Sequence, residues 1–353
     1  MSSPATDVEI IDVRSQHRFD DKALETYLAD TVPGFEGPLT VRQFQGGMSN
    51  PTFSLETPKK RYVMRKKPPG ELLKSAHQVD REYRVMKALA ETDVPVPTVN
   101  VLCMDDDVIG QAFYVMEHVE GRVLIDPAVP SFSKEDRAKL YENFTEVLAK
   151  LHLVDYKAVG LEDFGRPGNY YARQISRWSK QYVASITEDI PDMNKLMEWL
   201  PANIPTAEET TIVHGDYRIG NSVLHPTEPR IVAVLDWELS TLGHPMADVA
   251  YCAQEYYGHL GGGGFADLAD PREIGIPSED EFLRRYCELT GQPMVENWPF
   301  YIAYTLFRSA AILQGVYKRG LDGNASSDAS RFAGGPAKRA RWAMSVLEKA
   351  GMV

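Results

Sequence analysis

Cysteine is scarce in this sequence, and it contains no long apolar run. The three cysteines, Cys103, Cys252 and Cys287, are far apart and form no metal-ligand spacing, which suits a reducing cytoplasm and argues against a disulfide framework. No apolar run approaches the roughly 18 residues of a membrane span. Residues 1–12 are polar and acidic, without the basic and apolar regions of a secretory signal. We therefore expect a cytoplasmic protein that does not cross a membrane.

Positive charge is also in deficit, because 38 Lys and Arg stand against 50 Asp and Glu, a net charge of −12. A general nucleic-acid binder needs a basic surface to displace counterions, so the composition disfavours that class. An acidic chain would suit a cationic substrate, but many cytosolic proteins are equally acidic. Charge therefore leaves the substrate open, and nothing in the sequence indicates an oligomeric state.

The apolar pattern changes character along the chain of 353 residues. Residues 39–117 read as strands around one helix, which helical spacing places at residues 78–90. The later part is mainly helical, with helices predicted at residues 133–152 and 278–290 from capping residues and apolar stripes, and another near residues 336–350. We expect an α+β fold with a small, strand-rich N-terminal part and a larger, helical C-terminal part. Ligands often bind at such an interface between lobes.

The most informative stretch is IVHGDYRIGNSVL, followed by IVAVLDWE. The first apolar run ends in His-Gly-Asp at Asp216, Asn221 follows five residues later, and the second run delivers Asp236. Two strands that end in carboxylates, with an asparagine between them, can aim three oxygen ligands into one cleft. Phosphoryl transfer needs such a set, because one carboxylate orients the attacking hydroxyl and accepts its proton while hard oxygen ligands hold Mg²⁺ on the nucleotide phosphates.

This stretch resembles the catalytic loop of the aminoglycoside phosphotransferases and choline kinases, which are relatives of the protein kinases. VLDWE is similar to that family's second metal-binding strand, and GHPMADVAY matches the Gly-x-Pro-x-x-Asp-hydrophobic pattern after it. The resemblance, over about residues 44–251, implies a bilobal protein-kinase-like fold with an antiparallel-sheet lobe at residues 1–117 and a mainly helical lobe at residues 118–353. It implies transfer of the γ-phosphate of ATP, with Mg²⁺, to a hydroxyl of a small molecule.

The resemblance also assigns roles by position. Asp216 is expected to be the catalytic base, and Asn221 and Asp236 are expected to be the magnesium ligands. His214 would brace the loop through hydrogen bonds. Asp248 would be structural, capping or anchoring the helix that begins near Pro245.

The nucleotide site is expected in the small lobe. The family's phosphate-covering loop would lie at QGGMSN, where glycine lets the backbone approach phosphates closely. Arg65 holds the place of the family's basic strand residue, with Glu82 as its helix partner. The neighbouring Lys66 would point to the opposite strand face, and which of the two cations contacts phosphate stays open. The hinge in FYVMEHVEG would present its backbone to adenine. The expected nucleotide-binding set is Gly46, Gly47, Ser49, Asn50, Arg65, Glu82, Glu117 and Val119.

Two other functions compete with this interpretation. A nucleotide-binding pseudokinase or regulatory module is suggested by the non-lysine at position 65, although a binder has little need for Asp216, Asn221 and Asp236 together. A metal-dependent hydrolase built on His214, Asp216 and Asp236 would require further histidine ligands at fixed spacing, and no such pattern is recognisable.

The acceptor is less well defined than the reaction. The stretches YVMRKKPPGELLKSAHQVDREYRVMKAL and DWELSTLGHPMADVAYC look closest to the kinase-like domains found beside, or fused to, acyl-CoA dehydrogenases. This resemblance suggests a hydroxylated acyl-CoA or a related metabolite as the acceptor, and an aminoglycoside is not required. ATP and GTP are not distinguished.

Overall fold

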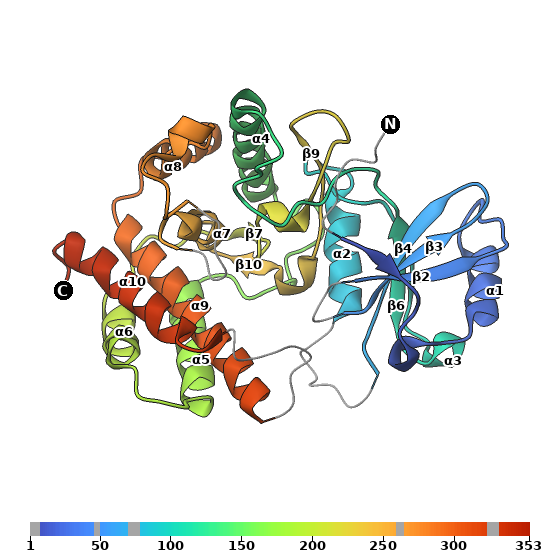
Figure 1. Ribbon diagram of the computed structural model, residues 1–353, viewed down its shortest axis with the longest axis horizontal. Coiled ribbons are helices and arrows are strands. Elements are labelled where there is room, and N and C mark those ends of the chain that lie inside the picture. The colour runs from blue at the N-terminus through green and yellow to red at the C-terminus, as the bar shows by residue number, and fades with distance from the viewer. Residues whose placement is uncertain (1–7, 46–49, 70–77, 259–264, 323–331) are drawn as a thin grey trace. The chain divides into compact units, whose positions relative to one another are not determined.

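The computed structural model describes residues 8–45, 50–69, 78–258, 265–322 and 332–353 (Figure 1). By packing, the chain divides into two compact units. Unit 1 consists of Met1–Ile125, Lys157–Leu161 and Arg218–Ser240, and unit 2 of Asp126–Tyr156, Glu162–Tyr217 and Thr241–Val353. The units are discontinuous in sequence, whereas the predicted lobe boundary after residue 117 was a single division of the chain and stays a prediction.

The described part of unit 1 is built on a six-stranded sheet whose neighbouring strands are all antiparallel. The strand order is β1-β2-β3-β4-β6-β5, with bounds Ile10–Ile11 (β1), Thr40–Phe44 (β2), Thr52–Glu56 (β3), Arg61–Lys66 (β4), Val99–Cys103 (β5) and Phe113–Glu117 (β6). The accompanying helices are α1 (Asp21–Thr31), α2 (Val79–Leu89) and the short α3 (Asp106–Ile109), with a single turn η1 (Ser15–His17). A separate hairpin joins β8 (Ser222–Leu224) to β9 (Ile231–Val234) and is flanked by the turns η2 (Ile219–Asn221) and η3 (Trp237–Leu239).

Helices α1 and α2 lie on opposite faces of this sheet (Figure 1). Leu24 and Leu28, one turn apart on α1, are fully buried in one core cluster with Phe53, Leu55 and Met64 of β3 and β4. This burial follows from the helical period of α1 and the two-residue period of the strands. The core of unit 1 therefore fixes which side of β4 faces α1 and which side faces α2.

The apolar face of α2 contains one carboxylate. Val85, Met86 and Leu89 are buried there, and Glu82 is also completely buried. A glutamate is almost never fully buried unless it is paired. Its position among apolar residues therefore indicates a specific partner, which is described below.

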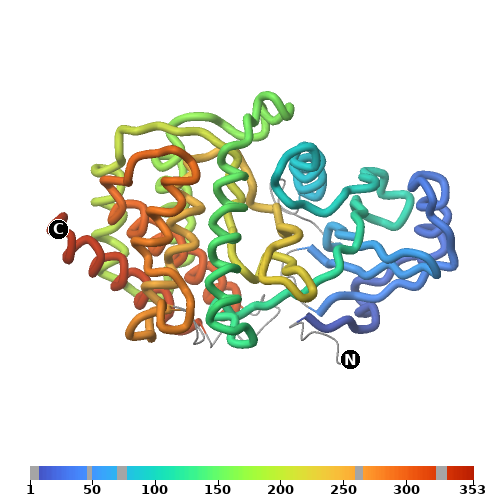
Figure 2. The backbone as a smooth tube through the Cα atoms, turned by 90° about the horizontal axis from the view of Figure 1, so that it is seen from above, coloured from blue at the N-terminus to red at the C-terminus, as the bar shows by residue number. Residues whose placement is uncertain are grey.

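Unit 2 is mainly helical. Its described elements are α4 (Lys134–Leu153), α5 (Tyr170–Ala184), α6 (Pro191–Ala202), α7 (Met246–Ala253), α8 (Glu279–Thr290), α9 (Trp298–Leu321), α10 (Gly335–Lys349), the turns η4 (Gln254–Tyr256) and η5 (Pro271–Ile274), and an antiparallel pair of strands, β7 (Thr211–Val213) and β10 (Thr241–Gly243). Helix α9 packs against α5, α7 and α10. Figure 2 traces the same path, with α4 in green and α9 and α10 in orange to red.

The α+β fold class expected from the sequence is confirmed by one unit built on an antiparallel sheet and one built mainly of helices. The helices predicted at residues 78–90, 133–152 and 278–290 correspond to α2, α4 and α8. Ser133 caps α4 by accepting a hydrogen bond from the Asp136 N–H, and Ser278 and Glu281 form a capping box at α8. No helix in the described ranges is long and apolar enough to span a bilayer.

Candidate active site

In unit 1, the β8–β9 hairpin brings Asn221 and Asp236 to one end of the same element. Ser222 pairs with Val234 in the strand register, and the Leu235 N–H donates to the Asn221 carbonyl at 2.8 Å. Asn221 immediately precedes β8, and Asp236 follows Leu235. The two predicted magnesium ligands are therefore neighbours, because an antiparallel hairpin places residues before its first strand beside residues after its second.

Asp236 has an unusual backbone conformation. Its φ of +65° and ψ of 60° lie in the left-handed region, which only a few per cent of non-glycine residues adopt and in which Asp and Asn are enriched. Its side chain is 34% exposed. Left-handed residues of this kind cluster at functional sites, where the surrounding structure holds them in place.

The guanidinium of Arg65 joins α2 to this hairpin. Nη1 donates to Glu82 Oε2 at 2.7 Å and to Asp236 Oδ1 at 2.9 Å. Glu82 also accepts hydrogen bonds from Asn50 Nδ2 at 2.8 Å and from the Tyr114 hydroxyl at 3.0 Å. The buried carboxylate on α2 thus has three donors. The pair that the sequence predicted, Arg65 with Glu82, is present as a buried ion pair.

Burial and charge act in opposite directions on this pair. Burial raises the pKa of Glu82 to about 7, and the charge of Arg65 opposes this rise. Burial also disfavours a charged Arg65, but Glu82, Tyr114 and Asp236 hold the pKa of the guanidinium well above its ordinary value. Arg65 therefore remains a cation with a forked donor set, which suits phosphate oxygens as well as carboxylates.

Lys66 points to the other face of β4. Its Nζ donates to Gln111 Oε1 at 2.7 Å and lies 5.1 Å from the centroid of the Phe19 ring. The side chain is buried, and burial lowers its pKa. Strand alternation thus separates the two cations, and Arg65 is the one beside Asp236.

Two matched substitutions test which cation serves a nucleotide. Arg65→Met is expected to weaken binding of Mg-ATP at least about 10-fold, because hydrogen bonds to charged groups contribute about 1.5–3 kcal/mol each. Lys66→Met is expected to leave the affinity near that of the wild type, since Lys66 contacts Gln111 and Phe19. Titration calorimetry on folded samples measures both. Equal losses in the two variants would contradict the assignment.

In unit 2, the predicted catalytic loop follows β7. The Asp216 N–H donates to His214 Nδ1 at 3.2 Å, so His214 braces the loop as expected from its position. Gly215 has a φ of +84°, a conformation that glycine adopts without strain. The Tyr251 hydroxyl of α7 donates to Asp216 Oδ1. The carboxylate predicted to be the base is therefore held by a phenol that the sequence interpretation did not single out.

Asp248 anchors this loop. Its carboxylate accepts hydrogen bonds from the backbone N–H of His214 at 2.6 Å and from the backbone N–H of Gly215 at 2.8 Å. The Nε2 atom of His152 lies 3.3 Å from the same carboxylate. Burial alone would raise the pKa of Asp248, but the bond and charge of His152, the charge of His214 and the Gly215 N–H bring it below its ordinary value. The N-terminus of α7, at Pro245, has no side-chain cap. Asp248 therefore anchors the loop rather than capping its own helix.

The predicted site residues divide between the two units. Asp216 belongs to unit 2, and the unit 1 residues are Asn50, Arg65, Glu82, Glu117, Val119, Asn221 and Asp236. Glu117 ends β6, where its N–H donates to the Thr98 carbonyl at 2.8 Å, and Val119 is half-buried beyond it. The predicted phosphate-loop residues Gly46, Gly47 and Ser49 lie outside the described residues.

Three residues around these sites were missed by sequence reasoning: Tyr114, Tyr251 and Arg308. Tyr251 could have been found, because it follows Asp248 by three residues on a helix and so shares its face. Tyr114 and Arg308 lie in apolar segments where a polar tip gives no periodic signal.

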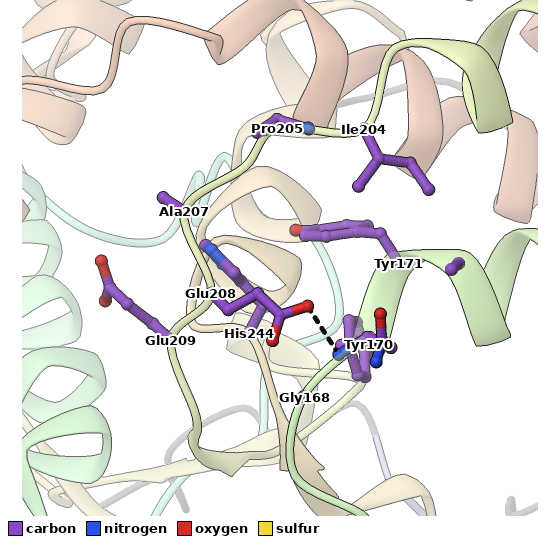
Figure 3. Close-up of a pocket in the computed structure, with 11 residues that line it drawn as sticks. Gly168, Tyr170, Tyr171, Ile204, Pro205, Ala207, Glu208, Glu209 and His244 are labelled. Atoms are coloured by element: carbon purple, nitrogen blue, oxygen red, sulfur yellow. Dashed lines mark hydrogen bonds between the residues drawn. The ribbon is translucent and has the colours of Figure 1, made fainter.

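Unit 2 also contains a cavity of about 240 Å³ at the end of the β7–β10 pair away from the catalytic loop. The cavity is lined by the start of α5, by the loop before β7 and by His244 (Figure 3). Within this lining, Glu208 accepts a hydrogen bond from the backbone N–H of Asn169. His244 is 5% exposed. Burial lowers its pKa to about 4, with the Ala207 carbonyl opposing this effect.

The buried His244 predicts a loss of stability in acid. In the unfolded chain, histidine binds a proton below about pH 6.5, whereas folded His244 does so only near pH 4. The free energy of unfolding should therefore fall as the pH drops from about 6.5 to about 4, by on the order of 3 kcal/mol from this group. Urea titrations across this range should show a smaller fall for His244→Gln. Identical pH slopes in both proteins would refute the prediction.

The fold, with one unit on an antiparallel sheet and one mainly of helices, is that of a kinase-like phosphotransferase family. Residues 40–288 match the phosphotransferase enzyme family, and the chain belongs to that family. The resemblance stated from the sequence is thereby confirmed, and the family finding replaces the hydrolase interpretation.

The relatives of the chain include acyl-CoA dehydrogenase family proteins. The Arabidopsis thaliana protein named probable acyl-CoA dehydrogenase IBR3 is 48% identical over 338 residues, which cover 89% of this chain and 41% of that protein. Human acyl-CoA dehydrogenase family member 11 is 44% identical over 333 residues, covering 91% of this chain and 42% of that protein. The chain therefore spans about two fifths of the length of these relatives.

Solved structures share the fold. A crystal structure from Ralstonia eutropha JMP134, provisionally described as an aminoglycoside phosphotransferase, has a TM-score of 0.85 and 50% identity and covers 94% of this chain and 99% of its own. A ternary complex of the aminoglycoside phosphotransferase APH(4)-Ia with AMP-PNP and hygromycin B has a TM-score of 0.58 and 18% identity, with coverages of 91% and 98%. The second likeness is one of fold alone.

Proposed function

We propose that this protein transfers the γ-phosphate of ATP to a hydroxyl of a small molecule with the help of Mg²⁺. The observation that carries the proposal is the guanidinium of Arg65, which joins Glu82 of α2 to Asp236 at the end of the β8–β9 hairpin. A cation paired with a helix glutamate beside a metal-binding aspartate is the arrangement that protein kinases require for activity. Membership of the phosphotransferase enzyme family supports the same reaction.

The proposed nucleotide site lies in unit 1. Asn221 and Asp236 are the proposed magnesium ligands, and a carboxylate and an amide oxygen fit this hard cation, which proteins usually bind through one or two carboxylates together with substrate phosphates. Bound magnesium neutralises charge on the phosphates. Arg65 would hold phosphate oxygens, fixed by Glu82. The loop residues Gly46, Gly47, Ser49 and Asn50 are proposed to cover the phosphates, and the backbone at Glu117 and Val119 to contact adenine.

Asp216 is the proposed base. It would accept the proton of the acceptor hydroxyl as the new oxygen–phosphorus bond forms and the bond from phosphorus to the departing ADP breaks. Orientation of the hydroxyl and acceptance of its proton are each worth about 10²-fold or more in rate.

We propose a hydroxylated acyl-CoA or a related metabolite as the acceptor, in the cytoplasm. The proposal is supported by the names of the relatives, which are acyl-CoA dehydrogenase family proteins. The match to this chain covers about two fifths of the length of each. An aminoglycoside acceptor, such as the hygromycin B of the APH(4)-Ia complex, is the competing chemistry.

The test is phosphate transfer from ATP to a panel of alcohols that includes hydroxyacyl-CoAs and aminoglycosides, with and without Mg²⁺. Transfer is expected to one class of acceptor, to require the metal, and to be lost in Asp236→Asn. Asparagine is the sharp substitution there, because it tolerates the left-handed backbone of Asp236 while removing the charge. Metal-independent transfer, or full activity of the variant, would overturn the mechanism.

Calorimetry separates the proposal from a pseudokinase. Magnesium-dependent binding of ATP with no product from any acceptor would favour a regulatory module. Binding together with transfer to an acceptor supports the enzyme.

A further inference from the structure

One face of helix α7 holds the predicted catalytic loop residue by residue. Asp248 accepts the N–H groups of His214 and Gly215, the Tyr251 hydroxyl donates to Asp216 Oδ1, and the Cys252 thiol donates to the Tyr217 carbonyl at 3.4 Å. Positions 248, 251 and 252 stand at i, i+3 and i+4, which share one side of a helix. The contacts at 248 and 252 reach loop backbone. The contact at Tyr251 differs, because it reaches the carboxylate that would do the chemistry.

The ring of Tyr251 is itself held by Arg308. The guanidinium carbon lies 5.6 Å from the Tyr251 ring centroid and 5.7 Å from that of Trp178. Arg308 Nη2 also donates to the Gly215 carbonyl at 2.8 Å, and the arginine is only 8% exposed. A cation near two aromatic rings is attracted to both, most strongly where water is excluded. Arg308 therefore contacts both the phenol of Tyr251 and the backbone of Gly215, the residue before Asp216.

An aspartate carboxylate without such a donor rotates readily, because its terminal torsion is broad and two-fold. A hydrogen bond to one oxygen narrows the range of this rotation. Transfer between positioned groups depends on this order, and a misplacement of about 1 Å can lower the rate about 10²-fold.

We propose that Tyr251 is a positioning residue that acts through Asp216: its hydroxyl fixes the rotation of the carboxylate so that the base meets the acceptor hydroxyl in one orientation, while Arg308 fixes the phenol. The phenol keeps its own proton throughout, and the acceptor's proton goes to Asp216. This inference rests on the proposed function, since it assigns a purpose to the base of that reaction.

The first test uses Mg-ATP with water as the acceptor, so that it needs no identified alcohol. Tyr251→Phe, which removes only the hydroxyl, is expected to lower kcat about 10- to 100-fold. The affinity for the nucleotide and the melting temperature should stay near the wild-type values. The matched control is Tyr257→Phe, because Tyr257 is half-buried like Tyr251 and donates to the Glu279 carboxylate at 2.8 and 2.9 Å, away from the loop. The control should retain full turnover.

A double-mutant cycle decides whether Tyr251 acts through Asp216. The variant with both Tyr251→Phe and Asp216→Asn should be no slower than Asp216→Asn alone, because orienting the side chain has no effect on the rate once the carboxylate that accepts the proton is gone. A further 10- to 100-fold loss in the double variant would overturn the inference, and so would full turnover in Tyr251→Phe.

Crystal structures of the wild type and Tyr251→Phe test the same idea without turnover. One orientation of the Asp216 carboxylate is expected in the wild type and more than one in the variant. An unchanged single orientation in Tyr251→Phe would refute the positioning role. If the wild type turns over no ATP under any condition, the proposed function fails, and these two structures still decide what Tyr251 does to Asp216.

Discussion

Asp216→Asn should lower phosphoryl transfer by about 10²- to 10⁴-fold, the contribution that a positioned general base typically makes. Asparagine keeps an oxygen for the Tyr251 hydroxyl and leaves the contacts of the loop backbone to Asp248 in place. The loss should therefore be one of chemistry rather than of folding. Steady-state kinetics with the best acceptor from the panel measures it, and the affinity for Mg-ATP should stay near that of the wild type.

The control for this variant is Asp30→Asn, an exposed carboxylate on α1 with the same change of charge. It should show wild-type turnover. A comparable loss in both variants would point to charge or stability rather than to a base. Undiminished transfer by Asp216→Asn would show that another group takes the proton.

Asp248→Ala should lower the free energy of unfolding more than any other of these substitutions. The carboxylate is completely buried and serves two backbone N–H groups and His152, so its removal leaves several buried polar groups without partners. Breaking a buried pair of this kind costs about 3–5 kcal/mol, out of the roughly 5–15 kcal/mol that stabilises a typical protein. Urea unfolding at low temperature measures the difference from the wild type.

Asp248→Asn is the milder companion variant, since it keeps one acceptor oxygen and the shape of the side chain. It should fall between the wild type and Asp248→Ala. A free energy of unfolding within about 1 kcal/mol of the wild type for the alanine variant would contradict the anchoring role, because even one buried unsatisfied group costs about that much.

Short-range sequence patterns predicted several elements of the fold. The capping residues of α4 and α8 and the apolar period of α2 predicted those helices because each depends on residues within two turns. The pairing of Arg65 with Glu82 also followed from position and family pattern. Long-range packing had no such signal. Residues 218–240 belong to unit 1 although they follow a long segment of unit 2, and nothing in their sequence states this.

The sequence pattern of β4 does not show which of its two faces packs against α2. Alternation places Arg65 and Lys66 on opposite faces, but both residues are buried, so the usual contrast between an apolar and a polar face is missing. Only the tertiary contacts, to Glu82 and Asp236 for one and to Gln111 for the other, distinguish them. The role of Arg308 could not be predicted from the sequence for a similar reason, since its partner carbonyl at Gly215 lies 93 residues away in the chain.

We propose that Asn221 and Asp236, at the end of the β8–β9 hairpin, hold magnesium on a bound nucleotide. A crystal structure with AMP-PNP and Mg²⁺ tests it most directly. We expect a metal coordinated by the Asn221 side-chain oxygen and the Asp236 carboxylate, with Arg65 on the phosphates. A nucleotide bound elsewhere, or a metal that neither residue touches, would contradict it.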